Sequence, residues 1–176
     1  MTTPLAVSPL AVTLGDPAGI GPELIARVWA SHSQELRGKA PFFVVGGAGA
    51  LDRAFRRCGF DNDRYSTCVI SEPLEASEVF GDALPVLGTD DCDYDPGKPS
   101  DEGARWALRC LTEATRLTIA GAASGLVTGP VSKIRLASVG FAHPGQTEFL
   151  AEACGYAPAD AVMMLDLRNT NALLFK

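Results

Sequence analysis

Residues 13–23 read TLGDPAGIGPE and follow a short apolar run, Leu10–Leu14, that predicts a strand. The glycines of this stretch let the backbone turn tightly and approach a ligand, while Pro22 and Glu23 suit the first turn of a helix. A glycine-rich loop between a strand and a helix is typical of an open α/β sheet, in which ligands bind at the carboxyl ends of the strands. The same loop also fits a tight connection without a ligand, because its spacing is not the dinucleotide fingerprint G-x-G-x-x-G.

Apolar runs alternate with helix-like patterns along the rest of the chain, and this alternation predicts parallel β-α-β units. Apolar spacings of three and four predict a long helix that is capped by Ser100 and ends near Gly121. Between Glu72 and Ser100 we expect loops with one or two minor strands. Further strands are expected at 10–14, 41–45, 125–129, 162–165 and 172–175, and further helices at 22–30, 50–60, from 131, and from 147 to about 154.

The composition predicts one soluble globular region over residues 1–176, with 47% hydrophobic and 20% charged residues. No apolar run approaches the ~18 residues of a membrane span, and the N-terminus lacks a basic signal region, so a cytoplasmic location is expected. The five cysteines are widely spaced, which favours reduced thiols. A net charge of −6 argues against a nucleic-acid partner, and a small anionic ligand would need local positive charge.

Two later stretches place polar side chains at helix starts. Residues 127–133 read VTGPVSK, where Lys133 either holds a phosphate or carboxylate or is an ordinary surface lysine. Residues 143–150 read HPGQTEFL, which puts Gln146 and Thr147 at a helix N-terminus, a position that attracts anions. The competing interpretation makes Thr147 the N-cap of that helix.

Asp16 and the two histidines are the remaining candidates. Asp16 either braces the glycine loop at a cleft or starts an ordinary Asp-Pro turn. His32 is predicted in a polar connector and His143 in a loop, and neither is assigned to a metal. Neither H-E-x-x-H nor G-x-S-x-G occurs, so a self-contained metal hydrolase or an α/β-hydrolase has no support.

The stretches TLGDPAGIGPE, GKPS, LVTGPVSK, GFAHPGQTEFLA and VMML, in this order, resemble the 4-hydroxythreonine-4-phosphate dehydrogenases of pyridoxine biosynthesis. The resemblance covers about residues 10–165. It implies an isocitrate/isopropylmalate dehydrogenase-like α/β/α sandwich, with two lobes flanking a cleft, in a homodimer. It also implies NAD-dependent oxidation and decarboxylation of 4-phosphohydroxy-L-threonine, a small phosphorylated substrate, with a divalent metal (zinc, magnesium or cobalt) polarising the reacting oxygens.

The family's substrate-contacting pair falls on Gln146 and Thr147 of this sequence. The family's usual histidine is Gln146 here, and its amide can still donate a hydrogen bond, though without charge. Lys133 and then Asp16 are the next candidates for a substrate contact. The family's metal-binding histidines and cofactor segments lie in a second half, after the strand at 171–175. The resemblance therefore implies an N-terminal portion, truncated before that half, with no metal ligand, cofactor contact or catalytic residue assigned.

Two other functions stay open. The first is a related dehydrogenase of another phosphorylated hydroxy acid, such as a four-carbon sugar acid phosphate, or of a cyclic diol, which the change to Gln146 favours. The second is a non-catalytic truncated remnant or binding module that associates through an exposed apolar strand at 172–175, because an unpaired strand edge invites pairing with another chain.

Overall fold

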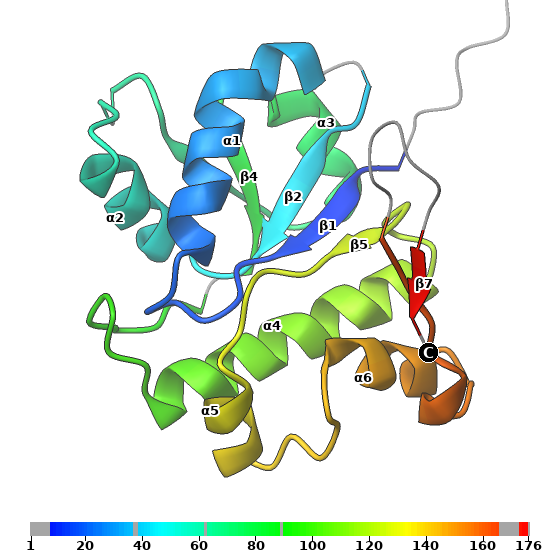
Figure 1. Ribbon diagram of the computed structural model, residues 1–176. Coiled ribbons are helices and arrows are strands. Elements are labelled where there is room, and N and C mark those ends of the chain that lie inside the picture. The colour runs from blue at the N-terminus through cyan, green and yellow to red at the C-terminus, as the bar shows by residue number, and fades with distance from the viewer. Residues whose placement is uncertain (1–7, 37–38, 62, 89, 166–172, 176) are drawn as a thin grey trace, which may run out of the picture. The chain divides into compact units, whose positions relative to one another are not determined.

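The computed structural model describes residues 8–36, 39–61, 63–88, 90–165 and 173–175 (Figure 1). The chain divides into two compact units, residues 1–139 and residues 140–176. The expectation of a single region over residues 1–176 stays a prediction. No helix in the described ranges is long and apolar enough to cross a membrane.

A five-stranded sheet forms the centre of the first unit, with strand order β3-β4-β2-β1-β5 and every pair parallel. Its strands are β1 (Leu10–Thr13), β2 (Phe42–Val45), β3 (Thr67–Ile70), β4 (Leu84–Leu87) and β5 (Leu126–Val127). Val45 is the register partner of Thr13 on one side and of Leu87 on the other. The strands therefore end together, and their carboxyl ends form one edge from which the connecting loops emerge.

Helices cover both faces of this sheet. They are α1 (Gly21–Leu36), α2 (Ala48–Arg57), α3 (Ala76–Val79), α4 (Asp101–Ile119) and α5 (Lys133–Ser138), with a short 3-10 turn, η1 (Pro73–Glu75). Figure 1 shows α1 and α2 on one face and α4 along the other. The predicted α/β/α arrangement is thus confirmed, and it follows from apolar residues on both faces of the strands, which parallel sheets must cover with helices.

The predicted long helix is confirmed as α4. The Ser100 hydroxyl accepts a hydrogen bond from the Gly103 N–H at 3.1 Å, which satisfies one of the free donors at the helix start. Gly121 follows the helix with a φ of +76°, a conformation that favours glycine and ends the helix. On its buried side, Trp106 and Leu111 pack into the core with almost no exposed surface.

The first helix is longer than the sequence predicts. α1 continues to Leu36, so His32 lies inside a helix rather than in a connector, and its Nδ1 lies 3.8 Å from Glu35 Oε2. Residues 31–36 contain no glycine or proline that would stop the helix. Gln34 further holds this last part in place by donating from Nε2 to the Gly81 carbonyl at 2.9 Å.

The second unit consists of short elements. They are α6 (Gln146–Ala153), the 3-10 turn η2 (Pro158–Asp160), and the strands β6 (Met163–Leu165) and β7 (Leu173–Phe175). The two strands pair antiparallel and form a sheet of their own. The final strand therefore has a partner along one edge, and association with another chain through its other edge stays a prediction.

Cysteine reactivity should separate the buried from the exposed thiols. Cys110 is buried on α4, and burial raises the pKa of its thiol to about 12, whereas Cys154 is exposed. Because the thiolate is the reactive form, we expect iodoacetamide at pH 8 to alkylate Cys154 rapidly and Cys110 only after unfolding. Equal rates, measured by mass spectrometry of peptides, would contradict this. The raised pKa also means that Cys110 stabilises the fold below pH 9 and loses that contribution as the pH rises toward 12.

Candidate functional site

The loops that follow β1 and β5 lie together at the carboxyl edge of the sheet, because these two strands are neighbours. The Gly129 N–H donates to the Thr13 hydroxyl at 2.9 Å, across 116 positions of sequence. The Asp16 N–H donates to the Pro130 carbonyl at 2.9 Å. The two stretches TLGDPAGIGPE and VTGPVSK therefore form one connected pair of loops.

Glycine is required at the point where these two loops touch. Gly15 has a φ of +78°, and a Cβ atom there would meet the Pro130 carbonyl oxygen. A Cβ atom on Gly129 would lie 2.7 Å from the Leu14 carbonyl oxygen. Protein backbone thus occupies the space beside these glycines, which therefore permit close loop packing rather than the approach of a ligand to their Cα atoms.

Asp16 braces the glycine loop from within. Its side chain is 5% exposed, and Oδ1 accepts a hydrogen bond from the Ala18 N–H at 2.9 Å. Its carbonyl oxygen accepts from the Gly19 N–H at 3.0 Å. This is the local turn that an Asp-Pro sequence favours. A contact between Asp16 and a substrate stays a prediction.

Removing the hydroxyl that joins the two loops should destabilise the first unit. Thr13 is 1% exposed, so Thr13→Val leaves the Gly129 N–H without this acceptor. We expect a loss of about 1–3 kcal/mol in the free energy of unfolding, whereas Thr13→Ser, which keeps the hydroxyl, should lose less. Urea unfolding of the three proteins measures the difference, and an equal loss in both variants would show that the hydrogen bond is unimportant.

Lys133 is the first residue of α5, which α4 holds in place. Arg135 Nη1 and the Ser138 hydroxyl lie 3.4 Å and 3.0 Å from Asp101 Oδ1, at the start of α4. The Ser132 hydroxyl caps α5 by accepting from the Arg135 N–H at 3.4 Å. The Lys133 side chain is exposed and makes no ion pair with the residues that the structure describes. It is an exposed positive charge in the loop pair, as an anion contact requires.

The start of α6 places the predicted pair in the second unit. Gly145 is the N-cap, with an extended backbone (φ −164°, ψ 179°), and Gln146 and Thr147 are the first two helical residues. The prediction that Thr147 caps the helix is therefore wrong, because the Phe149 N–H already bonds to the Gly145 carbonyl at 3.3 Å. Glycine has no side chain with which to cap the helix, and the first turn carries the positive end of the helix dipole.

A ring cluster precedes α6 and fixes how the chain enters it. The His143 ring lies 5.2 Å from Phe141 and 5.4 Å from Phe149, and His143 Nδ1 lies 3.8 Å from Glu152 Oε2. Such contacts across a helix start set the entry angle of the chain. The sequence predicted no role for His143. Phe141, two positions before it, and Phe149, six positions after it, were the signal that could have indicated its place in this cluster.

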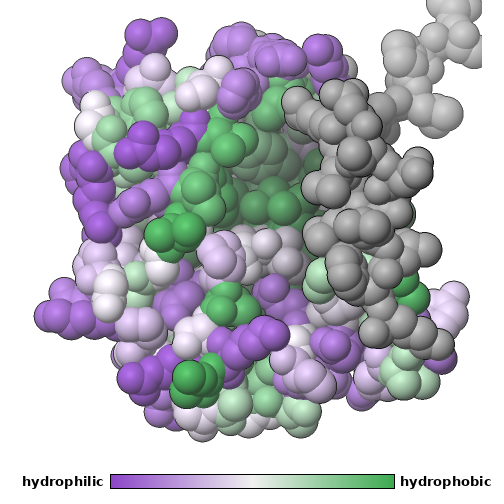
Figure 2. Space-filling model, viewed as in Figure 1, coloured by the Kyte–Doolittle hydropathy of each residue, from purple (hydrophilic) through white to green (hydrophobic). Residues whose placement is uncertain are grey.

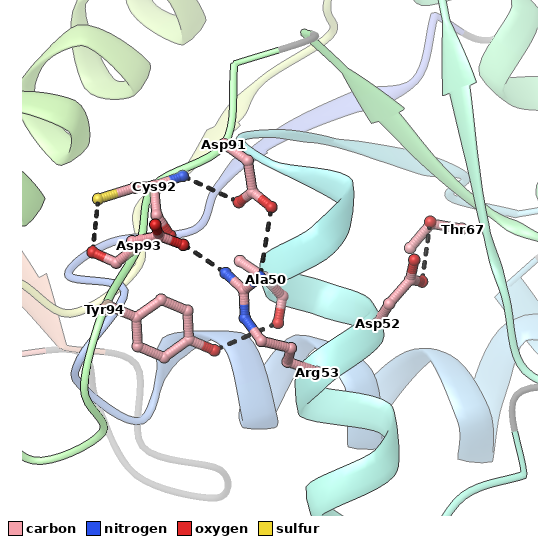
Figure 3. Close-up of polar contacts among 8 residues, drawn as sticks. All are labelled: Ala50, Asp52, Arg53, Thr67, Asp91, Cys92, Asp93 and Tyr94. Atoms are coloured by element: carbon pink, nitrogen blue, oxygen red, sulfur yellow. Dashed lines mark hydrogen bonds and ion pairs between the residues drawn. The ribbon is translucent and has the colours of Figure 1, made fainter.

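The loop that follows β4 is anchored on α2 by Arg53 (Figure 3). The Arg53 guanidinium donates to the Cys92 carbonyl at 3.1 Å, lies 3.6 Å from Asp91 Oδ2, and stands 4.9 Å from the centre of the Tyr94 ring. The Tyr94 hydroxyl donates to the Ala50 carbonyl at 3.4 Å. Burial is the main cause that raises the pKa of the Cys92 thiol. Sequence reasoning missed this cluster because its members belong to two distant segments.

A cleft of about 590 Å³ opens at the carboxyl ends of β2, β3 and β4, beside α4. Arg116, on its wall, donates to both carboxylate oxygens of Glu113 at 2.7 and 2.8 Å. These hydrogen bonds lower the pKa of Glu113. Because Arg116 already has a carboxylate partner, it is less available to bind an anionic ligand in the cleft.

The structure thus brings Asp16 and the loop before Lys133 to one edge of the first unit, and it places Gln146 beside Thr147 in the second. Among the described residues, no group of three or more His, Cys, Asp or Glu side chains gathers as a metal centre. These residues do not fit the divalent metal that the resemblance implies.

Comparison with known proteins identifies the family. The family described as "Pyridoxal phosphate biosynthetic protein PdxA" matches residues 39–175. The chain is 49% identical to a 4-hydroxythreonine-4-phosphate dehydrogenase of Erythrobacter litoralis, over 89% of this chain and 45% of that protein. It is 39% identical to a D-threonate 4-phosphate dehydrogenase of Bordetella bronchiseptica, over 87% and 43% of the two chains.

A solved structure agrees in fold. The 4-hydroxythreonine-4-phosphate dehydrogenase of Klebsiella pneumoniae superposes with a TM-score of 0.74 at 33% identity, over 91% of this chain and 48% of that one. The chain thus spans about half the length of the relatives that it matches. From its motifs, its fold and these matches, the chain belongs to the PdxA family.

Proposed function

We propose that this chain provides the first half of a dehydrogenase that oxidises 4-phosphohydroxy-L-threonine with NAD in pyridoxal phosphate biosynthesis. The names of the relatives support the reaction, and the start of α6 is the observation that carries the substrate role. The complete protein is proposed to be a cytoplasmic homodimer, as the resemblance to the family implies.

The side chains at the start of α6 suit an anionic oxygen of the substrate. Gln146 and Thr147 can each donate a hydrogen bond, and the positive end of the helix dipole adds attraction for a phosphate or carboxylate. Lys133 would supply a full positive charge, which the neutral Gln146 does not. Thr147 and Gln146 are therefore proposed to orient the substrate, and Lys133 is proposed separately as an anion contact of the first unit.

NAD would accept the hydride and the divalent metal would polarise the reacting oxygens. The described residues form no metal centre, and backbone fills the space beside Gly15 and Gly129. We therefore assign neither group to residues of this chain, and the roles proposed for Thr147, Gln146 and Lys133 concern only binding and orientation.

A chimera tests the proposal. In it, this chain replaces the matched half of the 49%-identical Erythrobacter litoralis relative, so that the candidate residues stand in a protein of complete length. We expect metal-dependent formation of NADH with 4-phosphohydroxy-L-threonine. A folded chimera without this activity, beside an active parent, would support the alternative that the chain is a non-catalytic remnant.

A second substrate is favoured by the Bordetella bronchiseptica relative, whose name gives D-threonate 4-phosphate. Both named substrates carry a phosphate on carbon 4, so the same anion contacts would serve both. The chimera should be assayed with each substrate in parallel. A kcat/KM at least tenfold higher with D-threonate 4-phosphate would replace the first proposal by the second.

A further inference from the structure

The sheet of the first unit has a topological switch point between β2 and β4. These strands are parallel neighbours, but the chain leaves β2 for α2 on one face of the sheet and leaves β4 for α4 on the other face (Figure 1). Loops that part in this way open a crevice at the carboxyl ends of the strands, and open α/β sheets bind ligands in such crevices. The switch point therefore marks a place for a ligand in addition to the loop pair that follows β1 and β5.

The cleft of about 590 Å³ opens at this switch point. Val45 and Gly46 line it at the end of β2, and Leu87 and Gly88 line it at the end of β4. Gly88 has a φ of +118°, a backbone conformation that favours glycine, and a Cβ atom there would lie 3.4 Å from the Gly46 carbonyl oxygen. Small-molecule sites usually have volumes of about 300–1,000 Å³, so the cleft is large enough for a ligand of this kind.

Apolar side chains form one part of the cleft lining. Val69, on the strand β3, is 53% exposed, and Leu87, on the neighbouring strand β4, is half-buried. On the side of α4, the lining includes the buried side chains of Trp106 and Leu117. Covering exposed apolar surface is favourable because it removes that surface from water. The cleft thus offers a contact surface to the apolar part of a ligand.

One cation on the cleft wall has no carboxylate partner. Arg109, Glu113 and Arg116 are four and three positions apart on α4, so they share the face that lines the cleft. Arg116 is bound to Glu113, whereas Arg109 is exposed and makes no ion pair with any residue in the described ranges. Burial raises the pKa of the Cys110 thiol, and the charge of Arg109 opposes part of this rise, so that charge acts on another residue of the lining. Arg109 is therefore available to bind an anionic group.

Acidic side chains in the lining limit the charge of the ligand. Glu72 and Asp90 line the cleft in addition to Glu113. These carboxylates would repel a ligand with several negative charges, such as a nucleoside diphosphate. A single carboxylate, by contrast, can bind the Arg109 guanidinium through two parallel hydrogen bonds. The lining therefore fits a molecule with one negative charge and an apolar body.

We propose that this cleft binds a small monocarboxylate with an apolar body. Arg109 contacts the carboxylate of this ligand, and Val69 and Leu87 contact its apolar part. None of the residues proposed to contact the dehydrogenase substrate lines the cleft. The inference therefore does not depend on the proposed reaction, and binding can be measured without an assay of activity.

Titration of the 176-residue chain with 2-naphthoate, followed by NMR of the backbone amides, tests this inference. We expect the amide signals of Gly46, Ser71 and Gly88 to shift and to saturate, because these residues line the cleft. Arg109→Gln should raise the dissociation constant roughly three- to tenfold, the effect of losing a charged hydrogen-bond partner at an exposed site. Arg105→Gln should leave it unchanged. It is the matched control, because Arg105 is an exposed arginine on the same helix that does not line this cleft.

A neutral ligand of the same shape, 2-naphthamide, tests the carboxylate contact without any substitution in the protein. It should bind more weakly than 2-naphthoate by a similar factor, and equal affinities for the two ligands would overturn the contact with Arg109. An equal loss of affinity in the Arg109 and Arg105 variants would do the same, because it would reveal only a general effect of charge.

The apolar groove between α1 and β5 is the competing place for the naphthalene ring. Figure 2 shows it as a hollow in which hydrophobic side chains gather. Leu24 and Val28 line this groove and not the cleft. Shifts confined to the amides of these two residues would place the ligand in the groove and overturn the inference. The absence of any saturating shift at millimolar 2-naphthoate would also overturn it.

Discussion

Gly15→Ala should destabilise the first unit by about 2–5 kcal/mol, which is the largest effect on stability that we expect from a single methyl group. An alanine at a φ of +78° costs about 1–2 kcal/mol for the left-handed backbone conformation alone. The added Cβ atom would also meet the Pro130 carbonyl oxygen, and relieving such a contact costs about 1–3 kcal/mol more. The loop after β1 would have to move away from the loop after β5.

Gly121→Ala is the matched control for this prediction. Gly121 has nearly the same φ, +76°, but nothing lies within 4 Å of the position that its Cβ atom would take. This variant should therefore lose only about 1–2 kcal/mol. Both tryptophans, Trp29 and Trp106, are buried in the first unit. Their fluorescence therefore reports the unfolding of this unit in urea. Equal losses in the two variants would show that the contact between the loops costs nothing.

The glycine comparison also shows what the sequence could and could not predict. Gly15 stands in a strand-to-helix turn, which the local pattern of glycine, proline and flanking apolar residues predicts correctly. The atom that forbids a side chain there belongs to Pro130, 115 positions later, and no local pattern names it. Local signals thus predicted the loop, and only the pairing of β1 with β5 explains why it must contain glycine.

The sequence predicted that the sheet is parallel, but it did not predict the order of the strands. Alternating apolar runs and helical patterns indicate parallel strands, and α4 was predicted from its cap to its end. β3, however, was missed, because Val69 is 53% exposed and the strand lacks a strong apolar alternation. One or two minor strands were predicted between Glu72 and Ser100, yet β4 in this range lies between β3 and β2 inside the sheet. Which strands pair depends on crossovers, and sequence spacing does not encode their direction.

The candidate site was predicted in part. The resemblance selected Gln146 and Thr147, and the structure shows them as the first two residues of α6 behind a glycine N-cap. The local pattern alone left capping and ligand binding equally open. Because Gly145 is the N-cap, Thr147 has no capping role. Which residue becomes the N-cap depends on the backbone conformation, and a Gly-Gln-Thr sequence does not determine that conformation.

Thr147→Val in the chimera should lower kcat/KM by about 10- to 150-fold. A hydrogen bond to a charged group contributes about 1.5–3 kcal/mol, and each 1.4 kcal/mol corresponds to about a factor of ten. Thr147→Ser, which keeps the hydroxyl, should retain most of the activity. Thr112→Val is the matched control, because Thr112 is an exposed helical threonine on α4 whose hydroxyl donates to the Leu108 carbonyl within the same helix. Equal effects at positions 147 and 112 would contradict a substrate contact.

Gln146→His tests the charge at the same helix start through the pH dependence of KM. A histidine with an ordinary pKa of about 6.5 becomes positive as the pH falls, whereas the glutamine amide stays neutral throughout. If residue 146 contacts an anionic group of the substrate, the KM of the Gln146→His chimera should fall as the pH drops from 8 to 6. The fall is measured relative to the KM of the chimera that keeps Gln146. The substrate phosphate titrates in the same range, but it does so identically in both proteins, so the ratio of the two KM values isolates the side chain. A ratio that does not change with pH would place the anionic group elsewhere, and Lys133 would then be the residue to examine by Lys133→Ala.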